Sequence, residues 1–204
     1  MRKEVNMKEI ILNKGFVAYV DDEDYDLVLS TPSGEKEAKW FIRFPSKYNC
    51  TPYVVKKIRS QIQKDFYSQI MNTPITTYQL SIHRLILKCG PNDIVDHIDG
   101  NGLNNQRKNL RICTPQQNSH NTRLRTDNTS GYKGVRRDPR IKEGSRCWVA
   151  NIREPTAKKN ITIGYYHSKE EAALAYNEMA SKLFGDYAYL NNLNSLFEYN
   201  YSLL

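Results

Sequence analysis

Residues 94–114 read IVDHIDGNGLNNQRKNLRICT, and this stretch decides the local fold. Two short β-like runs, Ile94–Ile98 and Leu110–Thr114, flank the loop Asp99–Asn109, which is rich in asparagine and glycine. Apolar runs on either side of a turn-rich segment are typical of a pair of antiparallel strands. The stretch therefore predicts a strand, a polar loop and a second strand.

The second run leads into a helix. Thr114 is placed to cap it, Pro115 suits the first helical position, and Gln117 stands three residues after the cap, as in a capping box. Asn118 then falls one turn into the helix. The predicted local order is strand, loop, strand, helix.

The polar residues of this unit suit phosphodiester hydrolysis, which needs an activated water and a cation to offset developing charge. The imidazole of His97, with an ordinary pKa of about 6.5, suits a general base. Carboxylate and amide oxygens, such as that of Asp96, are hard ligands for Mg²⁺ or Mn²⁺. Adjacent strand residues point to opposite faces, so both side chains reach one ion only through a distortion or a neighbour.

Several stretches resemble a known family, the HNH homing endonucleases, over about residues 78–122. They are Val95–Asn101, Asn104–Asn105, Asn109–Arg111, Thr114, Gln117–Asn118 and, upstream, His83–Ile86. The resemblance implies a ββα-metal module that nicks or cuts DNA, leaving a 5′ phosphate and a 3′ hydroxyl.

The same resemblance assigns roles by position. It implies that Asp96 and Asn118 hold one divalent ion, Mg²⁺ or Mn²⁺, that His97 is the general base, and that Asn109 pins the loop and helps to hold His97. The third letter of the motif is Asn118 rather than histidine, as in phage-type members. His120 would face away from Asn118 on a helix, so we expect it either to support a metal ligand through a hydrogen bond or to contact phosphate.

A calcium-binding loop is an alternative interpretation of these residues. A calcium loop starting at Asp96 would put Ile98 where an oxygen ligand is needed, and one starting at Asp99 would put Leu110 where the closing glutamate belongs. The ligand chemistry therefore excludes an EF-hand. His83 is expected to be a packed or orienting residue rather than the base.

A second module follows, with three strand candidates, Tyr132–Arg136, Cys147–Arg153 and Asn160–Tyr166. Ser168 and Glu171 form a further capping box before a helix. The residues expected on the buried face of that helix recur at helical spacing: Ala172, Tyr176, Met179 and Leu183.

This module resembles an AP2 domain over residues 131–191, through the stretches Ser130–Arg136, Trp148–Arg153, Ile163–Tyr166, Glu170–Ala173 and Phe184–Gly185. The resemblance implies a three-stranded antiparallel sheet, backed by one helix, that enters the major groove of DNA. By position, the residues implied to meet DNA are Lys133, Arg136, Asn151, Arg153 and Thr162, with Trp148 on or near the sheet. Plant-type members have other residue classes at Asn151 and Thr162, which leaves the target sequence open. Alternation places Lys133, Asn151 and Arg153 outward, and Val135 and Val149 inward.

The first 77 residues carry weaker patterns. Gly15–Ser30 alternates on both sides of an acidic run and suggests a hairpin or strand pair. From Thr51 a stripe at helical spacing predicts one helix, with the apolar residues Val55, Ile58, Ile62, Phe66 and Ile70. Cations off that stripe, on a solvated face or against DNA, are Lys56, Lys57, Arg59 and Lys64.

Charge favours a polyanionic partner. The net charge is +8, and residues 102–160 alone hold 14 Lys and Arg against 4 Asp and Glu. We expect double-stranded DNA, with Arg111 as a further contact, because neutralising phosphates releases counterions. The four cysteines form no metal-binding pair and are expected to be reduced: Cys50, Cys89, Cys113 and Cys147. No apolar run approaches the ~20 residues of a membrane helix, so we expect a cytoplasmic monomer without a membrane partner.

The predicted fold class is α+β. The predicted segments are an N-terminal region at 1–77, an HNH module at 78–123, a linker at 124–130, an AP2-type domain at 131–191 and a tail at 192–204. We expect the N-terminal region to hold a hairpin and a helix that form an arm contacting DNA. The predicted function is metal-dependent DNA cleavage. A regulator that binds DNA without cutting it and an RNA-binding protein, the latter on account of Tyr132, Tyr165 and Tyr166, remain as alternatives.

Overall fold

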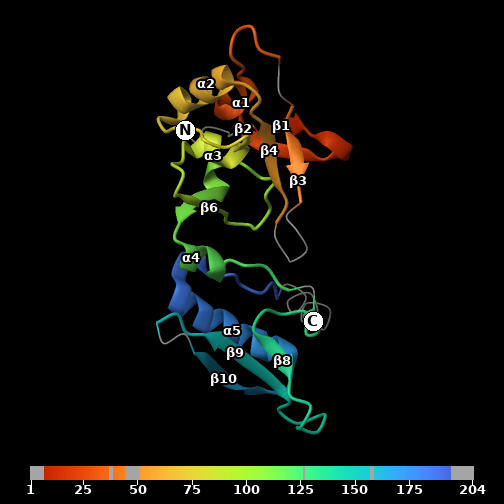
Figure 1. Ribbon diagram of the computed structural model, residues 1–204. Helices are drawn as coiled ribbons and strands as arrows, with labels where there is room; N and C mark the ends of the chain where they lie inside the picture. The colour runs from red at the N-terminus through yellow and green to blue at the C-terminus, as the bar shows by residue number, and fades with distance from the viewer. Residues whose placement is uncertain (1–6, 37–38, 45–50, 126, 157–158, 194–204) are drawn as a thin grey trace, which may run out of the picture. The chain divides into compact units, whose positions relative to one another are not determined.

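The computed structural model describes residues 7–36, 39–44, 51–125, 127–156 and 159–193 (Figure 1). The chain divides into two compact units, Met1–Pro115 and Gln116–Leu204. Each unit combines helices with antiparallel sheets, which confirms the α+β class. Cys50, one of the four cysteines expected to be reduced, and the tail beyond residue 193 lie outside the described residues.

The first unit begins with a strand pair, β1 (Met7–Ile11) and β2 (Val17–Asp21), joined through the 3₁₀ turn η1 (Asn13–Gly15). The helix α1 (Asp22–Leu29) follows directly. The second half of the predicted hairpin is therefore wrong. The acidic run lies in the first turn of α1, where carboxylates are favoured by the helix dipole.

A three-stranded antiparallel sheet comes next, in the order β3 (Phe41–Arg43), β4 (Tyr53–Lys57) and β5 (Gln79–Ser81). The helix α2 (Gln61–Met71) lies between β4 and β5 in sequence. The helix predicted from Thr51 is thus wrong over its first half, because those residues pair on both sides within a sheet.

The true helix α2 begins after Ser60, whose hydroxyl accepts a hydrogen bond from the amide of Gln63. Its buried residues are Gln63, Tyr67 and Met71, whereas Ile62 of the predicted stripe is 58% exposed. Lys56, expected on a solvated helix face, is instead buried in β4, where its ammonium group donates to Val28 O and Tyr67 Oη.

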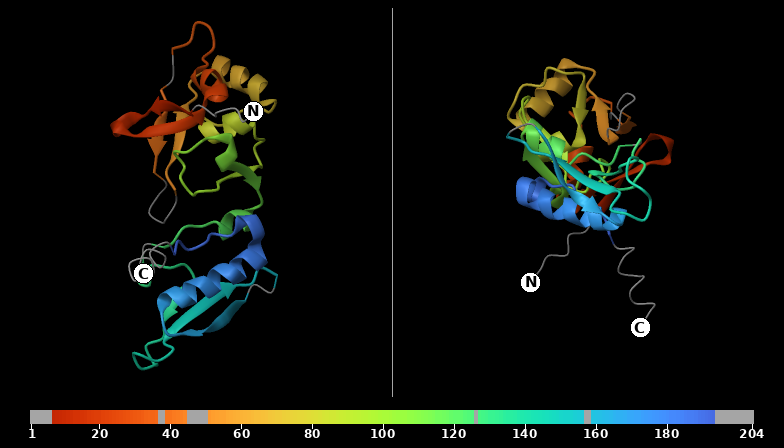
Figure 2. Two further views of the ribbon diagram at one scale, coloured as in Figure 1. Left: turned by 180° about the vertical axis from the view of Figure 1, so that it is seen from behind. Right: turned by 90° about the horizontal axis from the view of Figure 1, so that it is seen from below.

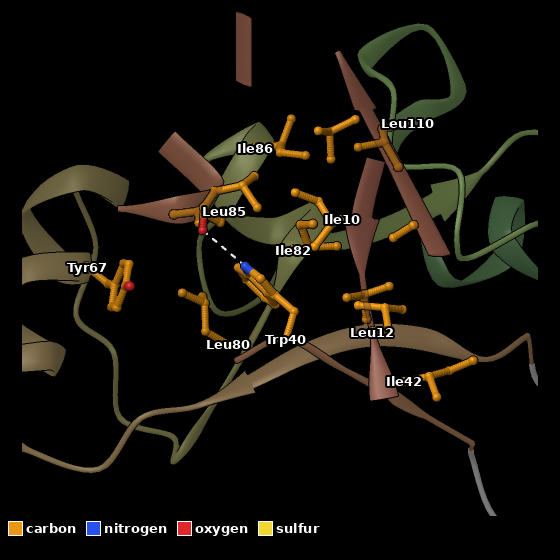
Figure 3. Close-up of a cluster of buried hydrophobic side chains, with 14 of the residues drawn as sticks. Ile10, Leu12, Trp40, Ile42, Tyr67, Leu80, Ile82, Leu85, Ile86 and Leu110 are labelled. Carbon is orange, nitrogen blue, oxygen red and sulfur yellow. Dashed lines mark hydrogen bonds between the residues drawn. The ribbon is translucent and has the colours of Figure 1, made fainter. Parts of the chain in front are cut away.

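The short helix α3 (Ile82–Leu87) completes the core of this unit. Trp40, Leu80 and Leu85 converge in it, and the indole nitrogen of Trp40 donates to Val28 O over 3.0 Å (Figure 3). The same cluster contains Ile10 from β1 and Leu110 from the DNA-cutting motif predicted above. One hydrophobic core therefore unites the first 77 residues with that motif.

The predicted strand pair is present as β6 (Ile94–His97) and β7 (Leu110–Cys113), in antiparallel register. The loop between them ends in the 3₁₀ turn η2 (Arg107–Asn109) and is bonded to β2 at several points. Asn105 N donates to Tyr19 O over 2.7 Å, and Arg107 N donates to the buried carboxylate of Asp21 over 2.8 Å. The loop is thereby fixed by the N-terminal strands.

The second unit starts with α4, whose bounds are Pro115–His120 and which begins at the predicted proline. Its sheet has the order β10 (Asn160–Tyr166), β9 (Trp148–Arg153) and β8 (Val135–Arg137), all antiparallel. The helix α5 (Lys169–Phe184) lies along one face of this sheet, as both views show, and ends in the 3₁₀ turn η3 (Gly185–Tyr187) (Figures 1 and 2). The second and third predicted strands and the helix are confirmed, whereas the first strand begins at Val135 rather than at Tyr132.

The predicted capping box of α5 is present in a shifted form. Ser168 Oγ accepts from Glu171 N over 3.1 Å, while the carboxylate of Glu171 accepts from His167 N, one residue before the cap. Small side chains bring the helix close to the sheet: its buried residues are Ala172, Ala173, Tyr176 and Ala180. At Gly134, with φ of +75°, an added Cβ would lie 2.1 Å from the Tyr176 ring.

Candidate functional site

The strand pair β6 and β7 positions the two central residues of the predicted site. In its register, Asp96 lies opposite Arg111 and His97 lies opposite Leu110. Both Asp96 and His97 are buried, at 7% and 9% exposure. Because strand side chains alternate between faces, the carboxylate and the imidazole meet different neighbours.

Asp96 forms a buried ion pair with Arg111. The guanidinium Nε and Nη2 lie 2.9 and 2.6 Å from Asp96 Oδ2. A buried carboxylate is tolerated only with such a partner, since its desolvation is costly. Arg111, predicted to contact DNA, here balances the charge of Asp96.

His97 is held by an asparagine of the loop. Its Nε2 lies 3.2 Å from Oδ1 of Asn105, a fully buried residue. Burial lowers the pKa of His97, while the bond to Asn105 and the charges of Asp99 and Asp96 act in the opposite direction. A neutral imidazole that donates from Nε2 carries its acceptor lone pair on Nδ1. The ring is thus suited to accept a proton near neutral pH.

The imidazole of His83 packs against that of His97, with ring centroids 5.2 Å apart and planes at 87°. Burial, with the charges of His97 and Arg84, lowers the pKa of His83 to about 3. Its Nδ1 is buried and has no hydrogen-bond partner among the described residues. His83 is therefore a neutral packing neighbour of His97.

Asn109 closes the loop. Its Oδ1 accepts from Asp99 N over 2.9 Å, and its Nδ2 donates to Asp99 Oδ1 over 2.9 Å and to Asn104 O over 2.8 Å. These bonds join the start of the loop to its end. The amide that contacts the His97 ring belongs to Asn105, which the residue assignment missed although the Asn104–Asn105 pair lies within the motif.

The remaining predicted residues of this motif, Asn118 and His120, lie on α4 in the second unit. Asn118 is exposed. The ring of His120 stacks on that of Phe184, with centroids 3.9 Å apart and planes at 18°. Burial, and then the charge of Lys133, lowers the pKa of His120.

A divalent cation fits the chemistry of these donors. The oxygen of a carboxylate suits a hard divalent cation, and an ion bound at Asp96 would share this carboxylate with Arg111, which already pairs with it. In the part of the chain that the structure describes, no group of three or more His, Cys, Asp or Glu side chains is placed to hold a metal. The ligand set implied by the sequence is one carboxylate and one amide. It contains only one side chain of these four residue types, so it would not form such a group.

The sheet of the second unit has one face away from α5, and cross-strand pairs define its residues. They are the pairs Arg136 with Val149, Tyr165 with Val149, Asn151 with Thr162, and Arg153 with Asn160. Thr162 Oγ1 donates to Asn151 Oδ1 over 3.0 Å. Four of the six predicted contacts in this module therefore share one face, and Tyr165 joins them.

Lys133 and Val149 lie elsewhere than alternation predicted, and Trp148, expected on or near the sheet, does not share the face of the four contacts above. Lys133 precedes β8, and its ammonium group donates to His120 O and Thr122 O over 2.8 and 2.7 Å. Trp148 is half-buried against the cluster on the helix side of the sheet. Val149, expected on the helix side, shares the strand face of Asn151 and is fully buried there.

Comparison with known proteins covers the segment that holds the first site. The sequence profile described as HNH endonuclease matches residues 82–120, which span α3, β6, β7 and α4. The chain is also 43% identical over 107 residues to an uncharacterized HNH endonuclease of Acanthamoeba polyphaga mimivirus, covering 51% of this chain and 50% of that protein.

A separate part of the chain, outside the HNH segment, is similar to plant AP2/ERF-domain proteins. It is 45% identical over 60 residues to dehydration-responsive element-binding protein 2E of Oryza sativa, covering 29% of this chain and 17% of that protein. It is also 45% identical over 74 residues to protein 2D of the same series in Arabidopsis thaliana, covering 36% and 34%. The chain spans half or less of the length of these relatives.

No solved structure matches the chain significantly. Among the helices that the structure describes, none is long and apolar enough to cross a membrane. The chain thus combines a segment that matches the HNH endonuclease model with a separate segment that is similar to plant AP2/ERF-domain proteins.

Proposed function

We propose that this protein is a metal-dependent endonuclease that hydrolyses phosphodiester bonds in double-stranded DNA. The observation that carries the proposal is the state of His97. Within the HNH segment, this residue is buried, bonded to Asn105 and packed against His83, with the carboxylate of Asp96 adjacent in sequence. A binding scaffold would need none of these features.

Asp96 and Asn118 are the proposed ligands of one divalent ion, Mg²⁺ or Mn²⁺. When bound, such an ion offsets negative charge on the phosphate and on the leaving oxygen. Arg111 has the separate role of balancing the buried charge of Asp96. The loop bonds of Asn109 keep β6 and β7 in register around these groups.

His97 is the proposed general base. Its Nδ1 accepts a proton from a water molecule whose oxygen attacks the phosphorus atom, and the bond from phosphorus to the 3′ oxygen breaks. The products are a 5′ phosphate and, after protonation, a 3′ hydroxyl. Asn105 orients the ring for this transfer, and His83 shields part of it from water.

The face of the second sheet is the proposed DNA-reading surface, through Arg136, Asn151, Arg153 and Thr162. Arginine can pair with guanine through two hydrogen bonds, and asparagine can do so with adenine. The bond between Thr162 and Asn151 fixes the orientation of that amide. Trp148 supports the sheet from its helix side.

The first unit carries a second proposed DNA contact, in keeping with the arm expected from the sequence. A groove of about 1030 Å³ is lined by the cations Lys36, Lys39, Lys57 and Arg59. Its carboxylate, Glu35, is already engaged by Ser60 and Gln63. The surplus positive charge favours a phosphate backbone.

We further propose a cytoplasmic monomer. Cys89, Cys113 and Cys147 are buried and form no disulfide among the described residues, which suits a reducing compartment.

The test is cleavage of supercoiled plasmid by the wild type and by His97→Ala, with Mg²⁺ and with EDTA. His167→Ala, an exposed histidine of the second unit, is the matched control. We expect metal-dependent nicking by the wild type and the control, and a loss on the order of a hundredfold or more in His97→Ala with DNA binding retained. Binding without cutting by the wild type, with Mg²⁺ or Mn²⁺ on diverse DNA, would favour the non-cutting regulator instead.

A further inference from the structure

The carbonyl end of α4 is bonded to a lysine of the AP2-like module. Lys133 Nζ donates to His120 O over 2.8 Å and to Thr122 O over 2.7 Å. The last carbonyl groups of a helix have no partner within the helix, and a cation near them is favoured by the helix dipole. Lys133 therefore caps the helix that carries Asn118.

A second contact holds the same end of α4. The imidazole of His120 stacks on Phe184, the last residue of α5. Lys133 contacts the backbone of His120, and Phe184 contacts its side chain. His120 lies two positions after Asn118. Both partners belong to the AP2-like module.

Lys133 is itself rigidly placed. Its backbone N–H donates to Asn191 Oδ1 over 2.7 Å, and its carbonyl accepts from Asn191 Nδ2 over 3.0 Å. Asn191 is in turn joined to Asn177 of α5 by two bonds of 2.7 and 2.9 Å. The ammonium group also lies 5.1 Å from the ring centroid of Tyr189. The backbone of Lys133 is therefore held in place by hydrogen bonds, and its side chain extends from there to α4.

We propose that Lys133 and His120 form a clamp that fixes α4, and with it Asn118, to the DNA-reading module. Lys133 is then a positioning residue for cleavage rather than a DNA contact. The inference rests on the proposed role of Asn118 as a metal ligand. A helix of six residues is too short to be stable alone, so its orientation depends on such contacts.

Burial lowers the pKa of Lys133 to about 8, which agrees with an ammonium group enclosed by protein rather than spread over a solvated surface. The AP2-like module therefore has two roles in this proposal. Its sheet offers a face to DNA, and the start of that sheet secures an element of the HNH segment.

The test compares Lys133→Met with Lys133→Arg, and uses Lys182→Met, which removes an exposed lysine of α5, as the matched control. Amide hydrogen exchange over residues 115–122 is measured in the full chain without DNA or metal. We expect Lys133→Met to speed this exchange about tenfold or more, and Lys133→Arg and the control to leave it near the wild-type rate. A thermal unfolding curve establishes that each variant is folded, and His120→Ala replaces Lys133→Met if that variant is not.

Cleavage and affinity are then measured on the same variants. We expect Lys133→Met to cut on the order of a hundredfold more slowly while its Kd for DNA changes less than about twofold, and Lys133→Arg to restore cutting. Unchanged exchange, with weaker binding and a smaller salt dependence, would make Lys133 a phosphate contact and overturn the clamp. Unchanged exchange and cutting would overturn it as well. If the wild type cuts no DNA, the proposed function fails, and the exchange rates alone still decide whether the clamp exists.

Discussion

The histidines of the HNH segment show how much of the site one residue type can reveal. The resemblance predicts His97 as the base, and its burial and the bond between its ring and Asn105 suit that role. Asn105 and Arg111 could not be placed from spacing alone. The partner of Asp96 depends on strand register, and the partner of His97 depends on the path of an irregular loop.

The burial of His83 predicts that stability falls in acid. Its pKa is about 3 in the folded protein and about 6.5 when unfolded, so between these values the unfolded chain binds more protons. The free energy of unfolding therefore decreases as pH falls from about 6.5, by up to about 1.4 kcal/mol per pH unit. Urea unfolding of the wild type and of His83→Phe at about pH 7, 6 and 5 measures this pH dependence of stability.

His83→Phe should show a shallower pH dependence, because it lacks the group that titrates. The lowered pKa of His97 contributes in the same direction and leaves a residual slope. His167→Gln, at an exposed position, should keep the wild-type dependence. Equal slopes for His83→Phe and the wild type would show that His83 is solvated in the folded protein.

Elements were predicted well where the pattern is local. The strands β6, β7, β9 and β10 and the helix α5 follow from runs and caps that lie within a few residues of each other. The strand β4 was mistaken for helix because Val55 and Ile58 fit a helical spacing, while its partner strands are distant in sequence. Periodicity cannot separate a short buried strand from a helix without those partners.

The cap of α5 gives a prediction at this scale. Ser168→Ala removes the acceptor of the Glu171 amide and leaves a helix N–H without its partner. We expect a loss of about 1 kcal/mol in the free energy of unfolding. Ser181→Ala, at an exposed site within the same helix, should cost little and serves as the control in urea unfolding. A loss no greater than that of Ser181→Ala would show that the cap is replaced by water.

At the scale of the whole molecule, the sequence divided the first 123 residues into an arm and a nuclease module, whereas the packing joins them. Ile10 and Leu110 share one core, and Asp21 of β2 accepts hydrogen bonds from Gln106 Nε2 and Arg107 N in the HNH loop. Contacts between segments some 85 residues apart in sequence have no local signal. The boundary after Pro115 has no local sequence signal either, because the sequence pattern runs from the strand pair into α4 without a break.

Asp21→Ala should therefore affect the nuclease, although Asp21 lies far from it in sequence. The buried amide groups of the loop would lose their acceptor, and we expect a loss of roughly 2 kcal/mol in the free energy of unfolding. Cleavage of plasmid should fall too, since the loop carries Asn105. The exposed Asp26→Ala is the control for both measurements. Normal stability with normal cutting in Asp21→Ala would contradict the proposed anchoring.

The shared core of the first unit also limits how the proposed nuclease activity could be transferred to another protein. A graft of the short HNH motif into another protein would leave Leu85, Ile86 and Leu110 facing solvent, because their packing partners come from the first 80 residues. A transferable cutting cassette has to include the N-terminal strands. Protein engineers who wish to retarget it would therefore exchange the DNA-reading part and keep the cutting part whole.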